Sequence, residues 1–293
     1  LFTSHEMSVQ VVRVGPDGDI YAATLPSGKV YRLSPHAENR NDDNATVVFD
    51  PAGTKEKPKY VWDLAFDAQG RLYIATGGPA AIYRVTPGGN AGTPNKADLF
   101  FKSDEEHIRS LAFDKAGNLI AGSDGSGLIY RIDPSGKAFV LYDSPKKEIT
   151  AVLVAPDGNI YAAGVGEKGH INLPPLAVTG QATVTATITI IQPGSVQAFS
   201  GNNLVPGGSE LYEIPHGDGP PRKIWAGKDD ILYALAWTPD GVLAGAGNRG
   251  RIYRVHDDGT WSDVAHLEAS QVTGFASSPK GIYVSTANSG RLY

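Results

Sequence analysis

The chain has 293 residues, of which 41% are hydrophobic, and it contains 35 glycines and 20 prolines. It is long enough to bury a core, and the frequent turn residues favour an all-β chain of short strands. The net charge of -5, with dispersed basic residues, does not favour a nucleic acid or an anionic membrane as partner. The absence of cysteine excludes disulfides and thiolate catalysis, and the sequence lacks an apolar run of about eighteen residues that would predict a transmembrane helix.

A short unit recurs along the chain and is the main signal in the sequence. Each copy contains a glycine that suits the positive-φ position of a tight hairpin. These turn glycines are Gly18, Gly70, Gly117, Gly158, Gly241 and Gly281, at spacings of 52, 47, 41, 83 and 40 residues. Four of the five intervals have the length of one propeller blade, and the fifth has that length plus about 40 residues.

Each unit is predicted to contain four antiparallel strands. In the second unit they are expected at 61–66, 71–75, 81–85 and 99–101. The third strand carries a recurring Tyr-Arg pair and ends before a proline, which cannot donate to a sheet ladder. We interpret this pair as structural, with Tyr packed between blades and Arg bonded to neighbouring carboxylates or backbone. Six units predict an all-β propeller of four-stranded antiparallel blades.

The two ends of the chain leave the blade number open. Residues 1–4 have the sequence of a fourth strand without its own blade, and the last unit stops after its third strand, at Tyr293. The N-terminal strand is therefore expected to complete the last blade and to close a six-bladed ring without exposed edges. The alternative is a seventh blade outside this sequence. Because the chain begins at Leu1, a processed or partial product is expected, with a periplasmic or extracellular localisation.

Blade four differs from the others by an insertion over 165–208, between its second and third strands. This insertion has no charged residue from Ile171 onward, and residues 183–190 alternate threonine with other side chains as a strand does. Uncharged, strand-forming sequence on a loop favours contact with another surface. The insertion is therefore expected to bind a protein partner, through the apolar residues Val184, Ile188, Ile190 and Phe199.

The segments 66–75 and 113–121 each begin with Phe-Asp and continue through a glycine turn into an apolar strand that ends in alanine. In these segments the chain resembles the bacterial β-propeller superfamily of NHL, SMP-30/gluconolactonase-like and YVTN/WD40-like repeats. The resemblance covers nearly the whole chain outside the insertion and implies the propeller architecture. A gluconolactonase-like enzyme would need one Glu, two Asn and one Asp around a metal, and the channel positions supply only Asp63.

One column of positions, eight residues before each turn glycine, is polar or aromatic and is predicted to line the mouth of a central channel. Its members are Gln10, Trp62, Arg109, Thr150, Tyr233 and Thr273. The next column is mostly small and contains Asp63. One hypothesis is a polar ligand held between Asp63, Arg109 and the rings of Trp62 and Tyr233. The alternative is that Asp63 and Arg109 form an internal ion pair.

Other candidates lie in the loops around the same rim. His107 precedes a first strand, and Asn248 and Arg249 lie in a turn between second and third strands. Acidic residues in the entry loops, among them Glu105 and Glu106, allow a Ca²⁺ site, but a solvated charged rim explains them as well. No cofactor and no metal ligand is therefore assigned.

The sequence favours a non-catalytic propeller that acts as a binding or assembly platform, with a protein partner at the insertion and the top face. The alternative is a channel-mouth hydrolase or lyase, lactonase-like and possibly Ca²⁺-dependent, that would use Asp63, Arg109 and nearby acidic residues. A lyase of the virginiamycin type would be expected to pair His and Glu near the channel, as His107 and Glu106 could do.

Overall fold

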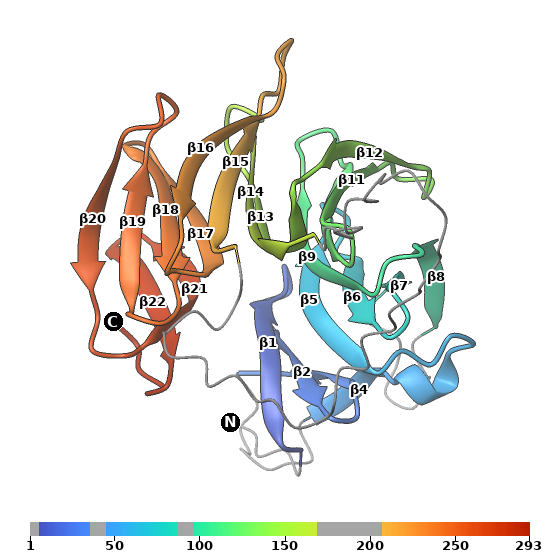
Figure 1. Cartoon of the computed structure of the whole chain (residues 1–293). Coiled ribbons are helices and arrows are strands. Elements are labelled where there is room, and N and C mark those ends of the chain that lie inside the picture. The colour runs from blue at the N-terminus through green and yellow to red at the C-terminus, as the bar shows by residue number, and fades with distance from the viewer. Residues whose placement is uncertain (1–5, 36–44, 87–95, 169–206) are drawn as a thin grey trace, which may run out of the picture.

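The computed structural model describes residues 6–35, 45–86, 96–168 and 207–293, and these residues form strands and short connections (Figure 1). The strands fall into six consecutive groups, called sheets 1 to 6 below. Sheet 1 contains β1 (Ser8–Val14), β2 (Ile20–Leu25), β3 (Val30–Leu33) and β4 (Ala45–Phe49), followed by a short 3₁₀ turn, η2 (Pro51–Gly53). Sheet 2 contains β5 (Tyr60–Phe66), β6 (Leu72–Gly77), β7 (Ala81–Val85) and β8 (Ala97–Lys102).

The remaining sheets repeat this plan. Sheet 3 contains β9 (His107–Phe113), β10 (Leu119–Asp124), β11 (Leu128–Ile132) and β12 (Ala138–Asp143). Sheet 4 contains β13 (Lys146–Val154), β14 (Ile160–Glu167), β15 (Ser209–Ile214) and β16 (Arg222–Gly227). Sheet 5 contains β17 (Leu232–Thr238), β18 (Gly241–Ala246), β19 (Arg251–Val255) and β20 (Trp261–His266), and sheet 6 contains β21 (Gln271–Ser278) and β22 (Gly281–Ala287).

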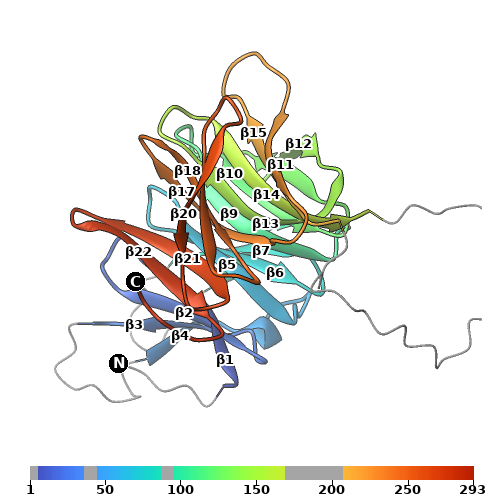
Figure 2. The same ribbon diagram turned by 60° about the vertical axis from the view of Figure 1, so that its left-hand side comes forward.

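The predicted strand order within a unit is confirmed. Sheets 1 to 5 each pair four sequential strands antiparallel, first to second, second to third and third to fourth. In sheet 6, Leu292 bridges to Ser285 beside β22, where the third strand of the unit is expected. Residues 1–4, which were predicted to supply the fourth strand of this unit, lie outside the described residues. The chain is thus an all-β fold of repeated antiparallel sheets, and Figure 2 shows the same sheets from a second side.

The core lies between the sheets, because each sheet has an apolar face toward each neighbour. Between sheets 1 and 2, for example, Tyr21 and Ala23 of β2 pack with Val61 and Leu64 of β5. Tyr83 of the third strand is buried in the same cluster, which agrees with the structural interpretation of the Tyr-Arg pair. The arginine of the pair also bonds to a neighbouring carboxylate as predicted, since Arg32 donates to Asp19 at 2.6 Å. Burial of these side chains from water is the main force that holds neighbouring sheets together.

The sheets approach one another most closely near the start of each first strand. Gly122 of β10 faces Ile149 of β13, and a Cβ atom at Gly122 would lie 2.8 Å from Ile149 Cβ. Gly245 of β18 faces Val272 of β21 in the same way, at 2.9 Å. These separations are too short for ordinary packing, so only glycine is accommodated at these two positions without a shift of the neighbouring sheet.

The ends of neighbouring sheets also form backbone bridges. His107 at the start of β9 pairs with Gly77 of sheet 2, and Glu148 of β13 pairs with Asp124 of sheet 3. Two carboxylates therefore lie opposite each other at the junction of sheets 3 and 4. Burial first, and then the charge of Glu148, raise the pKa of Asp124 above its ordinary value of 3.8. Like charges at directly opposite positions destabilise a sheet.

The insertion begins later than the sequence predicted. Val165, its predicted first residue, is still paired with Ser209, and β14 continues to Glu167. The two ends of the insertion therefore leave sheet 4 from adjacent paired strands. Its predicted contact residues, Val184, Ile188, Ile190 and Phe199, lie outside the described residues. No helix in the described part of the chain is long and apolar enough to cross a membrane.

The pairing of Asp124 with Glu148 predicts that Asp124→Asn stabilises the protein at pH 7. A carboxyl with a raised folded-state pKa costs stability once the pH exceeds its unfolded value, so the gain should be present at pH 7 and vanish as the pH falls toward 3.8. We expect a gain of about 0.5 kcal/mol, or roughly 1–2 °C in Tm, measured by thermal unfolding between pH 3.5 and 7.5.

Asp133→Asn is the matched control for this measurement. Ser135 and Lys137 bond to Asp133 and lower its pKa, so the same substitution there should lower Tm at pH 7. A Tm that does not change, or that falls, for Asp124→Asn at pH 7 would contradict an unfavourable Asp124 charge.

Candidate functional site

The first strands of all six sheets line one cavity of about 450 Å³. All six members of the predicted column contribute to its wall: Gln10, Trp62, Arg109, Thr150, Tyr233 and Thr273. The neighbouring column, from Val11 and Asp63 to Gly274, lines it as well. In Figure 1 the first strands β1, β5, β9, β13 and β17 lie closest to the centre of the molecule. These positions therefore line one shared cavity, whereas their place at the mouth of a central channel and their role in binding stay predictions.

Arg109 is fixed in the cavity wall by an aromatic ring and a carboxylate. Its guanidinium lies over the Trp62 ring, with Cζ 3.8 Å from the ring centroid, and its Nε donates to Glu148 at 2.6 Å. No further hydrogen bond to Arg109 is found among the described residues, so its Nη groups retain donor capacity. Because the guanidinium covers Trp62, a bound molecule would meet the charged group rather than the indole face.

Tyr233 lies in the part of the cavity wall that sheet 5 contributes, and the charges of Glu148 and Arg109 affect its pKa. Burial raises the pKa of Tyr233, and the charge of Glu148 raises it further, whereas Arg109 opposes this shift. The phenol is thus neutral at physiological pH and can both donate and accept a hydrogen bond. The group called the charged triplet below consists of Arg109, Glu148 and Tyr233, which come from three different sheets.

Asp63 has a different partner from the one the sequence hypothesis gave it. It does not pair with Arg109, because Arg13 of β1 donates to Asp63 Oδ1 at 2.6 Å and Arg109 pairs with Glu148 instead. The backbone N–H of Leu111 donates to its other oxygen at 2.9 Å. Asp63 thus connects sheets 1, 2 and 3, as an internal ion pair does. Burial raises its pKa, and Arg13 and the two backbone N–H groups of Leu111 and Leu64 oppose this effect.

His107 lies behind Trp62 rather than in the cavity wall. The two rings make an edge contact with centroids 5.4 Å apart, and a Cβ atom at Gly77 would collide with His107 Nδ1. This nitrogen is buried and has no hydrogen-bond partner. Burial lowers the pKa of His107, so the imidazole is neutral at pH 7. Glu106, His107 and Asp124 each place a potential ligand atom within 4.8 Å of the others.

Two further predicted site residues, besides His107, do not join the cavity wall. Asn248 has a positive φ of 72° and donates from its side chain to the Asp229 carbonyl at 2.8 Å. Arg249 pairs with the Asp229 carboxylate at 3.6 Å. Both therefore stabilise the turn between β18 and β19 with its neighbouring loop, and neither is part of the wall of the cavity.

The donor set of the cavity does not fit the metal site of a gluconolactonase-like enzyme. That site requires two asparagines, and the described wall contains none. Asp63, the carboxylate in the wall of the present cavity, already accepts hydrogen bonds from Arg13 and two backbone N–H groups. The group that offers ligands is instead Glu106, His107 and Asp124, which lies at the end of sheet 3 where β9 begins and β10 ends.

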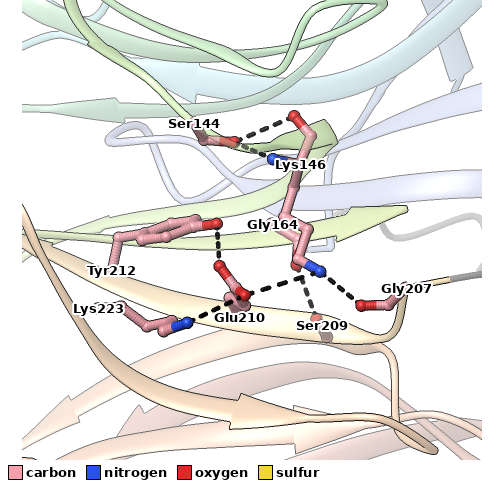
Figure 3. A network of polar contacts seen from close by, with 8 residues as sticks. All are labelled: Ser144, Lys146, Gly164, Gly207, Ser209, Glu210, Tyr212 and Lys223. Atoms are coloured by element: carbon pink, nitrogen blue, oxygen red, sulfur yellow. Dashed lines mark hydrogen bonds and ion pairs between the residues drawn. The ribbon is translucent and has the colours of Figure 1, made fainter. Parts of the chain in front are cut away.

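The ends of the insertion are fixed by a buried polar network (Figure 3). The buried ammonium of Lys146 donates to the Gly207 carbonyl and lies 3.8 Å from Glu210. Tyr212 donates to the other Glu210 oxygen at 2.6 Å. Burial opposes ionisation of Glu210, but Tyr212 and the ammonium groups of Lys146 and Lys223 outweigh it and lower the pKa. This network anchors residue 207, where the insertion rejoins the sheet.

Two residues of the site were not predicted from the sequence as its members. Arg13 lies in the cavity wall, five residues before Gly18, where the other units have Ala or Leu, so it was an outlier in an otherwise apolar column. Glu148 was placed with the acidic loops, although it is a half-buried residue of β13 that bonds to Arg109 of the cavity wall. A column-by-column comparison of the units would have found Arg13, while the reach of Glu148 across two sheets leaves no trace in the sequence.

Comparisons with known proteins agree on the architecture. No protein-family model matches the sequence, and no curated protein matches it. The structure resembles a virginiamycin B lyase from Staphylococcus aureus with a TM-score of 0.69, at 11% identity over 99% of this chain and 80% of the lyase. It resembles a putative gluconolactonase with a TM-score of 0.57, at 10% identity over 99% of this chain and 91% of that chain.

A third similar structure is a chain of a nidogen–laminin complex, with a TM-score of 0.58 and 14% identity over 89% of this chain and 83% of that chain. Identities this low establish the fold and not the activity. The repeated four-stranded sheets, the shared cavity of their first strands and these structural neighbours together show that the chain has the β-propeller fold.

Proposed function

We propose that the protein binds a small, polar, overall neutral molecule in the central cavity, at the charged triplet Arg109, Glu148 and Tyr233. The observation that carries the proposal is the geometry of Arg109, which is fixed by Trp62 at 3.8 Å and by Glu148 at 2.6 Å while its Nη donors remain available. A preorganised donor group of this kind binds with little loss of side-chain entropy. A cavity of about 450 Å³ has the size of a small-ligand site.

The charge balance of the cavity supports a neutral or zwitterionic ligand. Arg109 is paired with Glu148, and the second cation in the wall, Arg13, is paired with Asp63. An anion would therefore have to compete with a carboxylate already bound to each arginine. A molecule with both hydroxyl or amino donors and an acceptor can use Arg109, Glu148 and Tyr233 together. Sugars and amino acids belong to this class.

This proposal predicts a loss of binding in Arg109→Lys. Lysine keeps the charge but lacks the planar group that stacks on Trp62 and donates from several nitrogens, so affinity should fall about tenfold. The measurement is a thermal-shift screen with monosaccharides, amino acids and inorganic phosphate, followed by calorimetric titration of the best compound.

Arg71→Lys is the matched control, because Arg71 donates to Asp67 at 2.6 Å in an outer turn away from the cavity. It should bind as the unchanged protein does. Preferential binding of phosphate, or equal affinity in Arg109→Lys and Arg71→Lys, would contradict the proposed site.

A lyase or hydrolase activity is the second candidate. It is favoured by His107, whose buried Nδ1 lacks a partner and whose ring lies near Glu106 and Asp124. One of the similar lyase structures is a catalytically inactive variant in which a histidine is replaced by alanine, bound to quinupristin. In the present chain, a neutral His107 could act as a general base beside Trp62, outside the described cavity wall, and a divalent cation could bind Glu106 and Asp124.

The test incubates the protein with quinupristin and Mg²⁺ or Ca²⁺ and follows the product by mass spectrometry. A lyase breaks a bond by elimination, so the summed mass of its products equals the mass of quinupristin, whereas the products of a hydrolase carry the additional mass of one water. Activity should disappear in His107→Ala and persist in His216→Ala, a histidine on the loop between β15 and β16. Unchanged quinupristin with both cations would remove support for this substrate class.

We further propose a protein partner for the insertion, in keeping with the similarity to a chain of the nidogen–laminin complex. Because Val165 and Ser209 are paired, a short loop can replace residues 171–206 without opening sheet 4. The shortened protein should unfold within about 2 °C of the full chain, as expected for a change outside the core. It should also lose any partner recovered with the full chain. A large drop in Tm would show instead that the insertion belongs to the core.

A further inference from the structure

Asp124 is a carboxylate without a partner beside the charged triplet. It ends β10 and lies opposite Glu148 of β13, which bonds to Arg109 in the cavity wall. Among the described residues, no hydrogen bond or ion pair reaches the side chain of Asp124. Residues directly opposite each other in neighbouring strands have Cβ atoms about 4.5–5.5 Å apart. The carboxylates of Asp124 and Glu148 can therefore both contact one small group.

The negative charge at this point exceeds the positive charge around it. Glu106 adds a third carboxylate, with an oxygen within 4.8 Å of one on Asp124. The lysine and the arginine that attract Asp124 are Lys147 and Arg109. Lys147 is exposed and forms no ion pair in the described part of the chain, and Arg109 is already paired with Glu148. Three carboxylates thus share two cations, and a further cationic group here would relieve the repulsion between Asp124 and Glu148.

The polar atoms that a ligand would contact here are accessible. The carboxylate oxygens of Asp124, the second oxygen of Glu148 and the Nη groups of Arg109 form no hydrogen bond among the described residues. None of them belongs to the buried atoms that lack a partner, so solvent reaches each one. Because Glu148 and Arg109 are in direct contact, unused acceptors and unused donors of opposite charge lie next to one another.

We propose that the ligand site inferred above takes a free α-amino acid, with its ammonium group between Asp124 and Glu148 and its carboxylate on the Nη groups of Arg109. The proposed function allows both sugars and amino acids, and this inference rests on it and selects one class. An ammonium group has three donors and no acceptor, which suits two carboxylates, and a carboxylate suits the guanidinium. A sugar hydroxyl would leave the repulsion between Asp124 and Glu148 in place.

The balance between stability and binding agrees with this role for Asp124. Like charges at opposite positions destabilise the free protein, and a bound ammonium group removes that cost. A residue that lowers the stability of the free protein and strengthens binding is typical of a functional site. Asp124→Asn should therefore raise the Tm of the free protein, as predicted above, and weaken the binding of an amino acid. A purely structural residue would not combine these two effects.

The first measurement compares matched compounds on the unchanged protein at about pH 7.5, in buffer that contains EDTA. A thermal-shift screen of the common amino acids selects the one that stabilises most, and calorimetric titration gives its affinity. Its α-hydroxy acid, which has a hydroxyl in place of the ammonium group, and glucose are titrated in the same way. We expect both to bind at least about tenfold more weakly, because the charge-assisted hydrogen bonds to Asp124 and Glu148 are lost.

Two variants test the assignment to Asp124. Asp124→Asn should lose about tenfold in affinity for the amino acid and keep its affinity for the α-hydroxy acid. Asp133→Asn, in the turn between β11 and β12, is the matched control and should change neither affinity.

Equal affinity for the amino acid and its α-hydroxy acid, preferential binding of glucose, or an unchanged affinity in Asp124→Asn would overturn this inference. If Arg109→Lys still weakens binding in that case, the proposed ligand site remains. If no compound binds, or if Arg109→Lys binds as the control Arg71→Lys does, the proposed function fails as well. Binding that occurs only without EDTA would assign the position to a metal ion at Glu106, His107 and Asp124, and would also overturn the inference.

Discussion

The narrow space between neighbouring sheets near the centre of the molecule is the constraint on which the other features depend. An aliphatic side chain at the start of each first strand from β5 to β21 enters that space, and Ala23, Gly122 or Gly245 on the preceding sheet leaves room for it. Each such side chain contributes about 1.5–3 kcal/mol when it is fully buried. This packing sets the distance between sheets and brings six first strands around one cavity. Side chains one residue further along then necessarily project into a shared volume.

Charges in this confined region are stable only when they are paired. Asp63 accepts hydrogen bonds from Arg13 and from the backbone of Leu111, which joins three sheets through one carboxylate. Asp63 is buried whereas Arg13 is half exposed, and loss of Arg13 would leave this buried carboxylate without its cation, so we interpret Asp63 as structural. Arg109 differs, because Trp62 and Glu148 fix its position without using all of its donors. A charged group whose hydrogen-bonding atoms are all used within the protein is thus interpreted as structural. A charged group that keeps unused donors, as Arg109 does, can also bind a ligand.

The repeat made much of this architecture predictable from the sequence. Turn glycines such as Gly70 and the Tyr-Arg pair of third strands reflect local backbone and packing needs, which recur and can be recognised within one chain. The position of Arg109 in the cavity followed from its column. Its partner did not, because Glu148 lies 39 residues away and the contact depends on how two sheets are placed. The predicted pairing of Asp63 with Arg109 failed for the same reason, since Arg13 is closer in space.

The wall of the cavity also has an evolutionary consequence. Each sheet contributes one equivalent position to it, and the six positions hold Gln10, Trp62, Arg109, Thr150, Tyr233 and Thr273. From Trp62 onward, the residue before each of these positions is a fully buried aliphatic that packs between sheets. A single codon change can therefore alter one of the six equivalent positions in the wall while this packing stays intact. A scaffold built in this way can acquire a new specificity in small, independent steps.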